Sequence, residues 1–427
     1  MPNITHDRVA SMCDQLYSKL THRNAPIIAL SVIRDEQDIL ERFVRHTLYC
    51  VDGLLIVNHR SSDASRHILE SLSKEGLPLC FLDADELGKH QSAWLTSLAA
   101  AAATRLSSQV VIPLDADEFL RRPDGGDVRE YISTISRDDV HLISWQSYIP
   151  LENDPDNEPD VLRRITHRLA ISPRVQKVVV GGGIAAYESF RLGFGSHEIV
   201  AGFQKVDYLP DERLALAHFP IRSVSQFVAK IAVARLTIPL VPERSPDTGI
   251  HYEWLRNFTK ISLSMSRTEL RRAATLYGAA DDNCNEVLVL DPVATSDEVL
   301  QYSDGRPGDP VARIERIARD LAAPPGDERN GPSVGHFMEA KILFENDQMR
   351  NTLDAINVIF GHAGNRDNPS EIISIVGQSQ VVLTSIRSEL TLIRGELASI
   401  HASRFWRAFV FFSKLKRLMK TYIGFEL

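Results

Sequence analysis

Apolar and polar stretches alternate in blocks over the first 115 residues of the chain. Four short apolar runs of strand length stand at residues 27–33, 53–57, 78–82 and 110–114. Between them, apolar residues recur at steps of three and four, which predicts helices at 38–49, around 68–72 and at 91–105. Strands alternating with helices are typical of a parallel sheet covered on both faces. We therefore expect an α/β fold with a doubly wound, mostly parallel sheet.

The pattern changes after residue 140. Further strands are expected at 142–145 and 177–180, helices at 223–236 and 251–266, and a flexible connection within 303–333. We therefore divide the chain into four parts: a lead-in (1–25), an α/β domain (26–235), a mainly helical accessory region (236–345) and a helical tail (346–427).

Two features mark the tail. Apolar residues at alternating steps of four and three from Ile372 to Ile400, interrupted at Ser379, predict a coiled coil over 371–401 and hence a homo-oligomer. One long helix packed on its own domain is the alternative. Residues 403–417 combine five aromatic residues with basic ones, which suits a helix lying on an anionic membrane surface or one packed against protein.

Composition narrows the class of protein. The chain has 427 residues, 44% of them hydrophobic and 24% charged, which is typical of a soluble globular protein. Its formal net charge of −8 argues against a nucleic-acid partner. The four cysteines are too scattered for a disulfide framework or a zinc ribbon, and neither a signal peptide nor a spanning apolar run is evident. We expect a cytoplasmic protein, with peripheral contact at the inner face of the plasma membrane if the tail binds lipid.

Polar clusters follow three of the expected strands, at 34–36, 58–63 and 115–118. They are far apart in the sequence, but the carboxyl ends of parallel strands meet at one edge of the sheet, where ligands bind. Asp115 and Asp117 directly follow a buried run, and carboxylates so placed suit Mg²⁺ or Mn²⁺ bridging a diphosphate. An acidic surface turn or a helix cap is the alternative.

These motifs resemble the inverting family-two glycosyltransferases of the GT-A fold, and more closely their bacterial polysaccharide-associated relatives. The resemblance covers roughly residues 26–235. Asp35-Glu36 matches the pair after the first strand, Val57-Asn58-His59-Arg60-Ser61-Ser62-Asp63 matches Val-Asp-Asp-Gly-Ser-x-Asp, and Asp115-Ala116-Asp117 matches Asp-x-Asp.

The resemblance implies a role for each matched position. Asp35, Glu36, Asn58 and Asp63 would line the nucleotide pocket, and Asp115 and Asp117 would hold the metal and the ribose–diphosphate. Asn58 and His59 stand where the family has two carboxylates. This departure leaves the identity of the base open.

Later residues supply further candidates. His218 follows an alternating apolar run and is expected to be a third metal ligand, with His197 as the competing candidate. Arg222 and Lys230 are candidates for contact with the diphosphate. A structural histidine and solvated surface charges are the alternatives.

The catalytic base is the least constrained assignment. Inverting transfer needs a group that takes the proton of the acceptor hydroxyl. Glu188 is the first choice because it follows a glycine-rich turn, and Asp211 and Glu198 are its rivals.

We therefore predict an inverting, metal-dependent glycosyltransferase. It would move a sugar from a nucleoside diphosphate sugar, the donor, to a hydroxyl of a glycan or glycoconjugate acceptor. Two other readings stay open: a phosphatase that forms an aspartyl-phosphate, and a non-catalytic coiled-coil scaffold with a degenerate nucleotide-sugar domain.

Overall fold

The structure is a computed structural model. It describes residues 4–21, 24–171, 173, 175–199, 206–240, 252, 255, 259–279, 287–295 and 298–322. The chain divides into two compact units, 1–358 and 359–427, and all the described residues belong to the first. The predicted coiled coil at 371–401 and the aromatic and basic segment at 403–417 lie outside the described residues.

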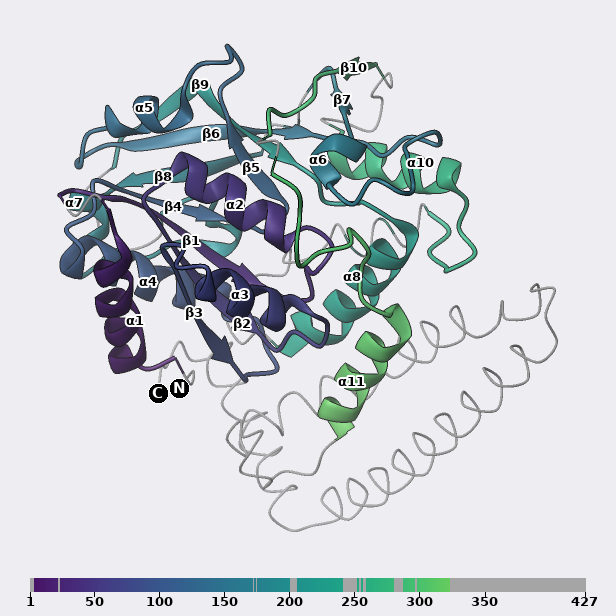
Figure 1. The fold of residues 1–427 in the computed structure, drawn as a ribbon, viewed down its shortest axis with the longest axis horizontal. Coiled ribbons are helices and arrows are strands. Elements are labelled where there is room, and N and C mark those ends of the chain that lie inside the picture. The colour runs from purple at the N-terminus through teal and green to yellow at the C-terminus, as the bar shows by residue number, and fades with distance from the viewer. Residues whose placement is uncertain are drawn as a thin grey trace, which may run out of the picture. The chain divides into compact units, whose positions relative to one another are not determined.

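Among these residues, eight strands form one mixed sheet in the order β3-β2-β1-β4-β8-β6-β9-β5 (Figure 1). The strands are β1 (Ile27–Ile33), β2 (Gly53–His59), β3 (Leu79–Ala84), β4 (Val110–Leu114), β5 (Glu118–Arg121), β6 (Val140–Ser147), β8 (Gln176–Gly181) and β9 (Tyr208–His218). A separate antiparallel pair joins β7 (His167–Leu169) to β10 (Leu288–Leu290). The α/β class is confirmed, and β3, β2, β1 and β4 are parallel as predicted.

Helices cover both faces of these first four strands. On one face lie α2 (Leu40–Cys50), α3 (Ser65–Lys74) and α5 (Val128–Ser133), and on the other lie α1 (His6–Lys19) and α4 (Gln91–Arg105). Every residue of β1 and β2 is buried, as expected for strands between two helical layers. The expected lead-in is part of this core, because α1 buries Val9, Met12 and Leu16 in the same cluster as α4.

The second half of the sheet curls. Only residues 115–117 separate β4 from β5, yet the two strands stand at opposite ends of the order β4-β8-β6-β9-β5. Pro113 lacks a backbone N–H, and the ladder between β4 and β8 ends before it, at Val111. Because residues 115–117 connect β4 and β5 directly, the first and last strands of this half of the sheet lie close together at that point.

The remaining described elements flank the curl. They are α6 (Val161–Arg164), α7 (Gly182–Ala185), η1 (Phe194–Ser196), α8 (Val224–Thr237), η2 (Ile238–Leu240), α10 (Arg267–Gly278) and α11 (Pro310–Ala322). The helix predicted at 251–266 is wrong for residues 259–266, which are not helical. Ser266 and Glu269 instead form a capping box, which starts α10 at Arg267.

The segment that leads into α11 is held against α2. The Glu41 carboxylate accepts hydrogen bonds from the backbone N–H groups of residues 301–303, and Ser303 donates to the Gln37 carbonyl. α11 then packs beside α8 (Figure 1). The described part of the expected flexible connection is thus fixed by hydrogen bonds. None of the described helices is long and apolar enough to cross a membrane.

Candidate active site

Three strand ends meet at one edge of the sheet. Ile33 of β1 is paired with Asn58 of β2, and Ser31 of β1 with Leu114 of β4. Adjacent strands lie about 4.8 Å apart. Segments 34–36, 58–63 and 115–118, separated by up to 84 positions in the sequence, therefore converge as expected.

Asp115 is held by a lysine that the sequence reading missed. Its Oδ2 lies 2.7 Å from Lys177 Nζ, and its Oδ1 accepts a 2.8 Å hydrogen bond from Gln91. Lys177 also lies 2.8 Å from Glu118, whose carboxylate accepts from the Asp115 N–H. Burial alone raises the pKa of Asp115, but Lys177 and Lys89 outweigh burial and lower it to about 2. Burial raises the pKa of Glu118 to about 8 against the opposing effect of Lys177.

Asp117 is surrounded by basic side chains. Its Oδ2 lies 2.9 Å from Lys230 and 3.8 Å from Arg222, and its Oδ1 lies 3.7 Å from His218 Nε2. Burial alone raises the pKa of Asp117, but Lys230, His218 and Arg222 bring it below its ordinary value. Asp117 is therefore a buried carboxylate that stays ionised.

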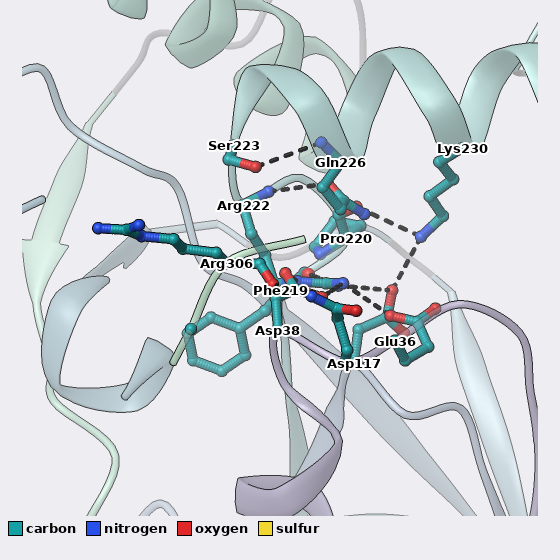
Figure 2. Close-up of polar contacts among 12 residues, drawn as sticks. Glu36, Asp38, Asp117, Phe219, Pro220, Arg222, Ser223, Gln226, Lys230 and Arg306 are labelled. Carbon is teal, nitrogen blue, oxygen red and sulfur yellow. Dashed lines mark hydrogen bonds and ion pairs between the residues drawn. The ribbon is translucent and has the colours of Figure 1, made fainter. Parts of the chain in front are cut away.

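Arg222 links two acidic residues from the β1 edge (Figure 2). Its guanidinium donates to both oxygens of Asp38, at 2.7 and 2.9 Å, and to Glu36 at 2.6 Å. It also donates to the Phe219 carbonyl at 3.1 Å. Burial raises the pKa of Glu36 to about 7 against the opposing effect of Arg222. Arg222 thus positions carboxylates, and most of its donors are already used.

Both histidine candidates pack against Trp145. The ring of His218 is tilted over the indole at 4.1 Å between centroids, and that of His197 meets it edge-on at 5.6 Å. His197 Nδ1 lies 2.7 Å from the carbonyl of Gln176, the first residue of β8. His218 Nδ1 is buried and has no hydrogen-bond partner among the described residues. Burial lowers the pKa of His218 to about 4, so its imidazole is neutral at pH 7.

Asp35 and Asp63 stabilise the turns after β1 and β2. Asp35 has a left-handed backbone (φ 56°) and accepts hydrogen bonds from the N–H and hydroxyl of Ser62. Asp63 accepts from the N–H groups of Ser65 and Gln37. Burial and the charge of Asp35 raise the pKa of Asp63. Both predicted pocket residues are at the edge, with their oxygens used within the protein.

Asn58 lies at the same edge, at the end of β2. It donates to Asp83 at 2.6 Å, while its amide oxygen is buried and has no hydrogen-bond partner among the described residues. That oxygen could accept from a ligand only if the side chain turned toward it.

The structure separates the three candidates for the catalytic base. Gly181, at the end of β8, is paired with Val110 at the start of β4, and Asp115 follows the other end of β4. The chain therefore leaves the sheet at the edge opposite Asp115 before it reaches Glu188, which is exposed. On the neighbouring strand β6, Asp211 pairs with Ile143 and His218 with Ser147, which places the two roughly 13 Å apart at about 3.3 Å per residue. Asp211 accepts hydrogen bonds from Tyr131 and His141. Glu198 is exposed. It follows His197, whose ring lies next to the carbonyl of Gln176, the first residue of β8.

Part of the predicted ligand set fits a divalent cation. Asp117 and neutral His218 face each other, and a carboxylate with an imidazole suits Mn²⁺. Asp115 faces Lys177 and Gln91, and joins only if its carboxylate turns away from them. In the described part of the chain, no group of three or more His, Cys, Asp or Glu residues is arranged to hold a metal ion.

Several residues of this edge escaped the sequence reading for different reasons. Lys177 immediately precedes the apolar residues of β8, so the sequence pattern places it at a strand boundary and gives no sign of a functional role. Gln91 is the first residue of α4, where a polar residue is ordinary. Asp38 stands only three residues after Asp35, and this short spacing could have identified it as a residue of the same edge. Arg313 reaches Asp35 across 278 residues, and no local pattern announces such a contact.

A scan against protein-family models finds no match to this chain, and a search of curated proteins finds no significant match either.

Proposed function

We propose that this protein is an inverting, metal-dependent glycosyltransferase with a GT-A-type fold, which transfers a sugar from a nucleoside diphosphate sugar to a hydroxyl of a glycan or glycoconjugate. One observation supports it above the others. Two ionised carboxylates, the half-buried Asp115 and the buried Asp117, lie among lysines at the edge where β1, β2 and β4 end.

The basic side chains supply positive charge that would stabilise the leaving diphosphate. Transfer leaves negative charge on the departing diphosphate, and fixed cations in a buried site stabilise such charge. Lys177 and Lys230 are held by Asp115 and Asp117, so their ammonium groups are oriented before the donor arrives. Arg222 fixes Glu36 and Asp38 beside them.

Asp117 and His218 would hold the metal, with Asp115 joining on reorientation. A bound Mn²⁺ or Mg²⁺ supplies Lewis-acid neutralisation of the leaving diphosphate. The chain's own contribution is a carboxylate kept ionised by Lys230 and an imidazole kept neutral by burial.

For the base, placement favours Glu198 over the first choice, Glu188. Glu198 is next to His197, which is tied to β8 one residue before Lys177. Asp211 is buried in hydrogen bonds elsewhere on β9. We assign proton removal from the acceptor hydroxyl to Glu198.

The test is donor hydrolysis by the full-length protein against a panel of nucleoside diphosphate sugars, with and without Mn²⁺. We expect release of the nucleoside diphosphate from one donor and its loss when the metal is chelated. Absence of turnover together with absence of metal-dependent nucleotide binding refutes the proposal. Phosphate release from simple phosphoesters would favour an aspartyl-phosphate phosphatase instead.

Asp117→Asn tests the site itself. We expect at least a hundredfold loss of donor hydrolysis, because an amide neither binds the cation nor balances Lys230. Asp124→Asn is the matched control, since Asp124 is an exposed carboxylate paired with Arg122. Equal activity of the two variants removes Asp117 from the site.

A further inference from the structure

Three arginines converge where β1 and β2 end. Arg34 follows β1 directly and Arg60 follows β2, while Arg313 comes from α11, outside the alternating strands and helices. Only 6–7% of the Arg60 and Arg313 side chains is exposed. The site described above uses none of the three.

Their hydrogen-bonding capacity is far from filled. Arg60 pairs with Asp320 and donates to the Asp85 carbonyl, while its Nε has no hydrogen-bond partner in the part of the chain that the structure describes. Arg313 pairs with Asp35 through Nε at 3.2 Å and donates to the Asp35 carbonyl, and no described residue hydrogen-bonds to its Nη1. Arg34 Nε and Nη2 are both buried without a hydrogen-bond partner among the described residues.

α11 brings two of its charged residues to this place together. Arg313 and Asp320 are seven positions apart, two helical turns, and so lie on the same face of the helix. The approach of α11 is fixed upstream by Glu41, which binds the backbone of residues 301–303. Gln37 also binds the Arg306 carbonyl at 2.9 Å. Arg313 is therefore placed by the fold and is not a chance surface contact.

Two of the three arginines have carboxylate partners. Asp35 pairs with Arg313 and Asp320 pairs with Arg60, whereas Arg34 forms no ion pair with a described residue. Burial, together with the charges of Arg60 and Arg313, lowers the pKa of Arg34 to about 10 against the opposing effect of Asp35. A buried guanidinium without acceptors costs the free energy of its lost hydration. An added oxyanion would accept from the unpaired donors and pair with the charge of Arg34.

We propose that Arg34, Arg60 and Arg313 form a binding site for a phosphate-type oxyanion, completed by α11. Guanidinium groups suit this ligand because their planar N–H pairs match the oxygens of a phosphate. The edge that carries the arginines also carries Lys177 and Lys230, and three adjacent strand ends span about 10 Å. That span suits a nucleoside diphosphate, so the oxyanion has two sources, a phosphate group of the nucleotide donor or free phosphate. Only the first source rests on the proposed function.

Calorimetric titration of the full-length protein with inorganic phosphate, in a buffer free of other oxyanions, tests the site. We expect binding in the millimolar range or tighter, and at least tenfold weaker binding in Arg34→Gln and Arg313→Gln, since each loses charge-assisted hydrogen bonds. Arg316→Gln, on the exposed side of α11, is the matched control and should bind within twofold of the unmodified protein. Absence of phosphate binding, or equal binding by Arg34→Gln, overturns the proposal.

Thermal unfolding without ligand separates a binding role from a structural one. Arg313→Gln removes a partner of Asp35 and so destabilises the fold. Arg34→Gln breaks no hydrogen bond or ion pair among the described residues, so its unfolding midpoint should stay the same or rise. A marked fall in the Arg34→Gln midpoint would mean that Arg34 is structural, against the proposal.

A parallel titration with nucleoside diphosphates identifies the source. If their affinity also falls tenfold in both arginine variants, the oxyanion belongs to the nucleotide. If only phosphate binding falls, the anion site stands and its link to the donor is refuted. Phosphate binding that depends on Arg34 in a protein without donor hydrolysis would refute the proposed function and leave this inference standing.

Discussion

Two clusters of buried charge join residues 298–322 to the α/β core, and they differ in how completely they are satisfied. Around Glu41, both carboxylate oxygens accept hydrogen bonds, and each nitrogen of the Arg45 guanidinium has a carboxylate partner. At the ends of β1 and β2, Arg34, Arg60 and Arg313 retain unpaired donors. The ingredients are the same, arginine and carboxylate, but only the first cluster is complete without a ligand.

The difference separates structural from functional charge. A buried ion pair stabilises a fold only when its remaining donors and acceptors are also paired. The Glu41 cluster meets this condition and fixes the path of the chain into α11. The arginine cluster does not meet it, and its unpaired donors are the feature expected of a site that awaits a partner.

Glu41→Ala is expected to have the largest effect on stability. It removes the acceptor of three backbone N–H groups and one partner of Arg45, and should cost about 3–5 kcal/mol in the free energy of unfolding. Urea denaturation followed by circular dichroism measures it. A loss below about 1 kcal/mol would show that the Glu41 cluster is as replaceable as a surface ion pair, and would remove the contrast with the arginine cluster.

His46, beside Arg45 on α2, predicts an acid-sensitive step. Burial, with a smaller contribution from the charge of Arg42, lowers the pKa of His46 from 6.5 to about 4 against the opposing effect of its hydrogen bond to the Leu120 carbonyl. The unfolded chain binds the proton more tightly, so stability present above pH 6.5 should be lost as the pH falls toward 4, by about 3 kcal/mol at most.

Unfolding free energies at a series of pH values check this step. His46→Gln should flatten the profile between pH 6.5 and 4. The exposed His67, replaced in the same way, should leave the profile unchanged. An identical slope in all three proteins would show that acid acts elsewhere.

Glu75→Gln should have the smallest effect and sharpens the comparison from within the satisfied cluster. Glu75 also binds Arg45, but a quarter of its side chain is exposed. Water replaces much of what is lost, so we expect about 0.5 kcal/mol or less. A loss of unfolding free energy close to that of Glu41→Ala would mean that the contribution of each carboxylate in this cluster does not depend on its exposure.

Much of the fold was predictable where burial is continuous. β1 and β4 stand at the predicted residues because a strand covered on both faces must be apolar throughout. The same reasoning placed Asp115 and Asp117 at an edge. The curl of the second half was not predictable, since it depends on pairings such as Glu118 with His218 across 100 positions.

The candidate site was predictable in its acidic residues and not in their partners. Asp115 follows a readable strand, whereas Lys177 reaches it from a strand 62 residues later. The strand position of Asp211 did not reveal that its carboxylate accepts hydrogen bonds from Tyr131 and His141. The helix start at Arg267 was visible in Ser266 and Glu269, but an apolar pattern continuing from upstream concealed it.

The contact between Glu41 and the backbone of residues 301–303 also sets an order of events during synthesis. The two partners are separated by 260 residues or more. At about 5–20 residues per second, a ribosome needs roughly 13–52 s to supply the second partner after the first. In that interval β1, β2 and α2 have already emerged, but Glu41 must remain hydrated. The nascent chain therefore holds an incompletely closed helical layer, a natural substrate for a chaperone, until residue 303 has left the exit tunnel.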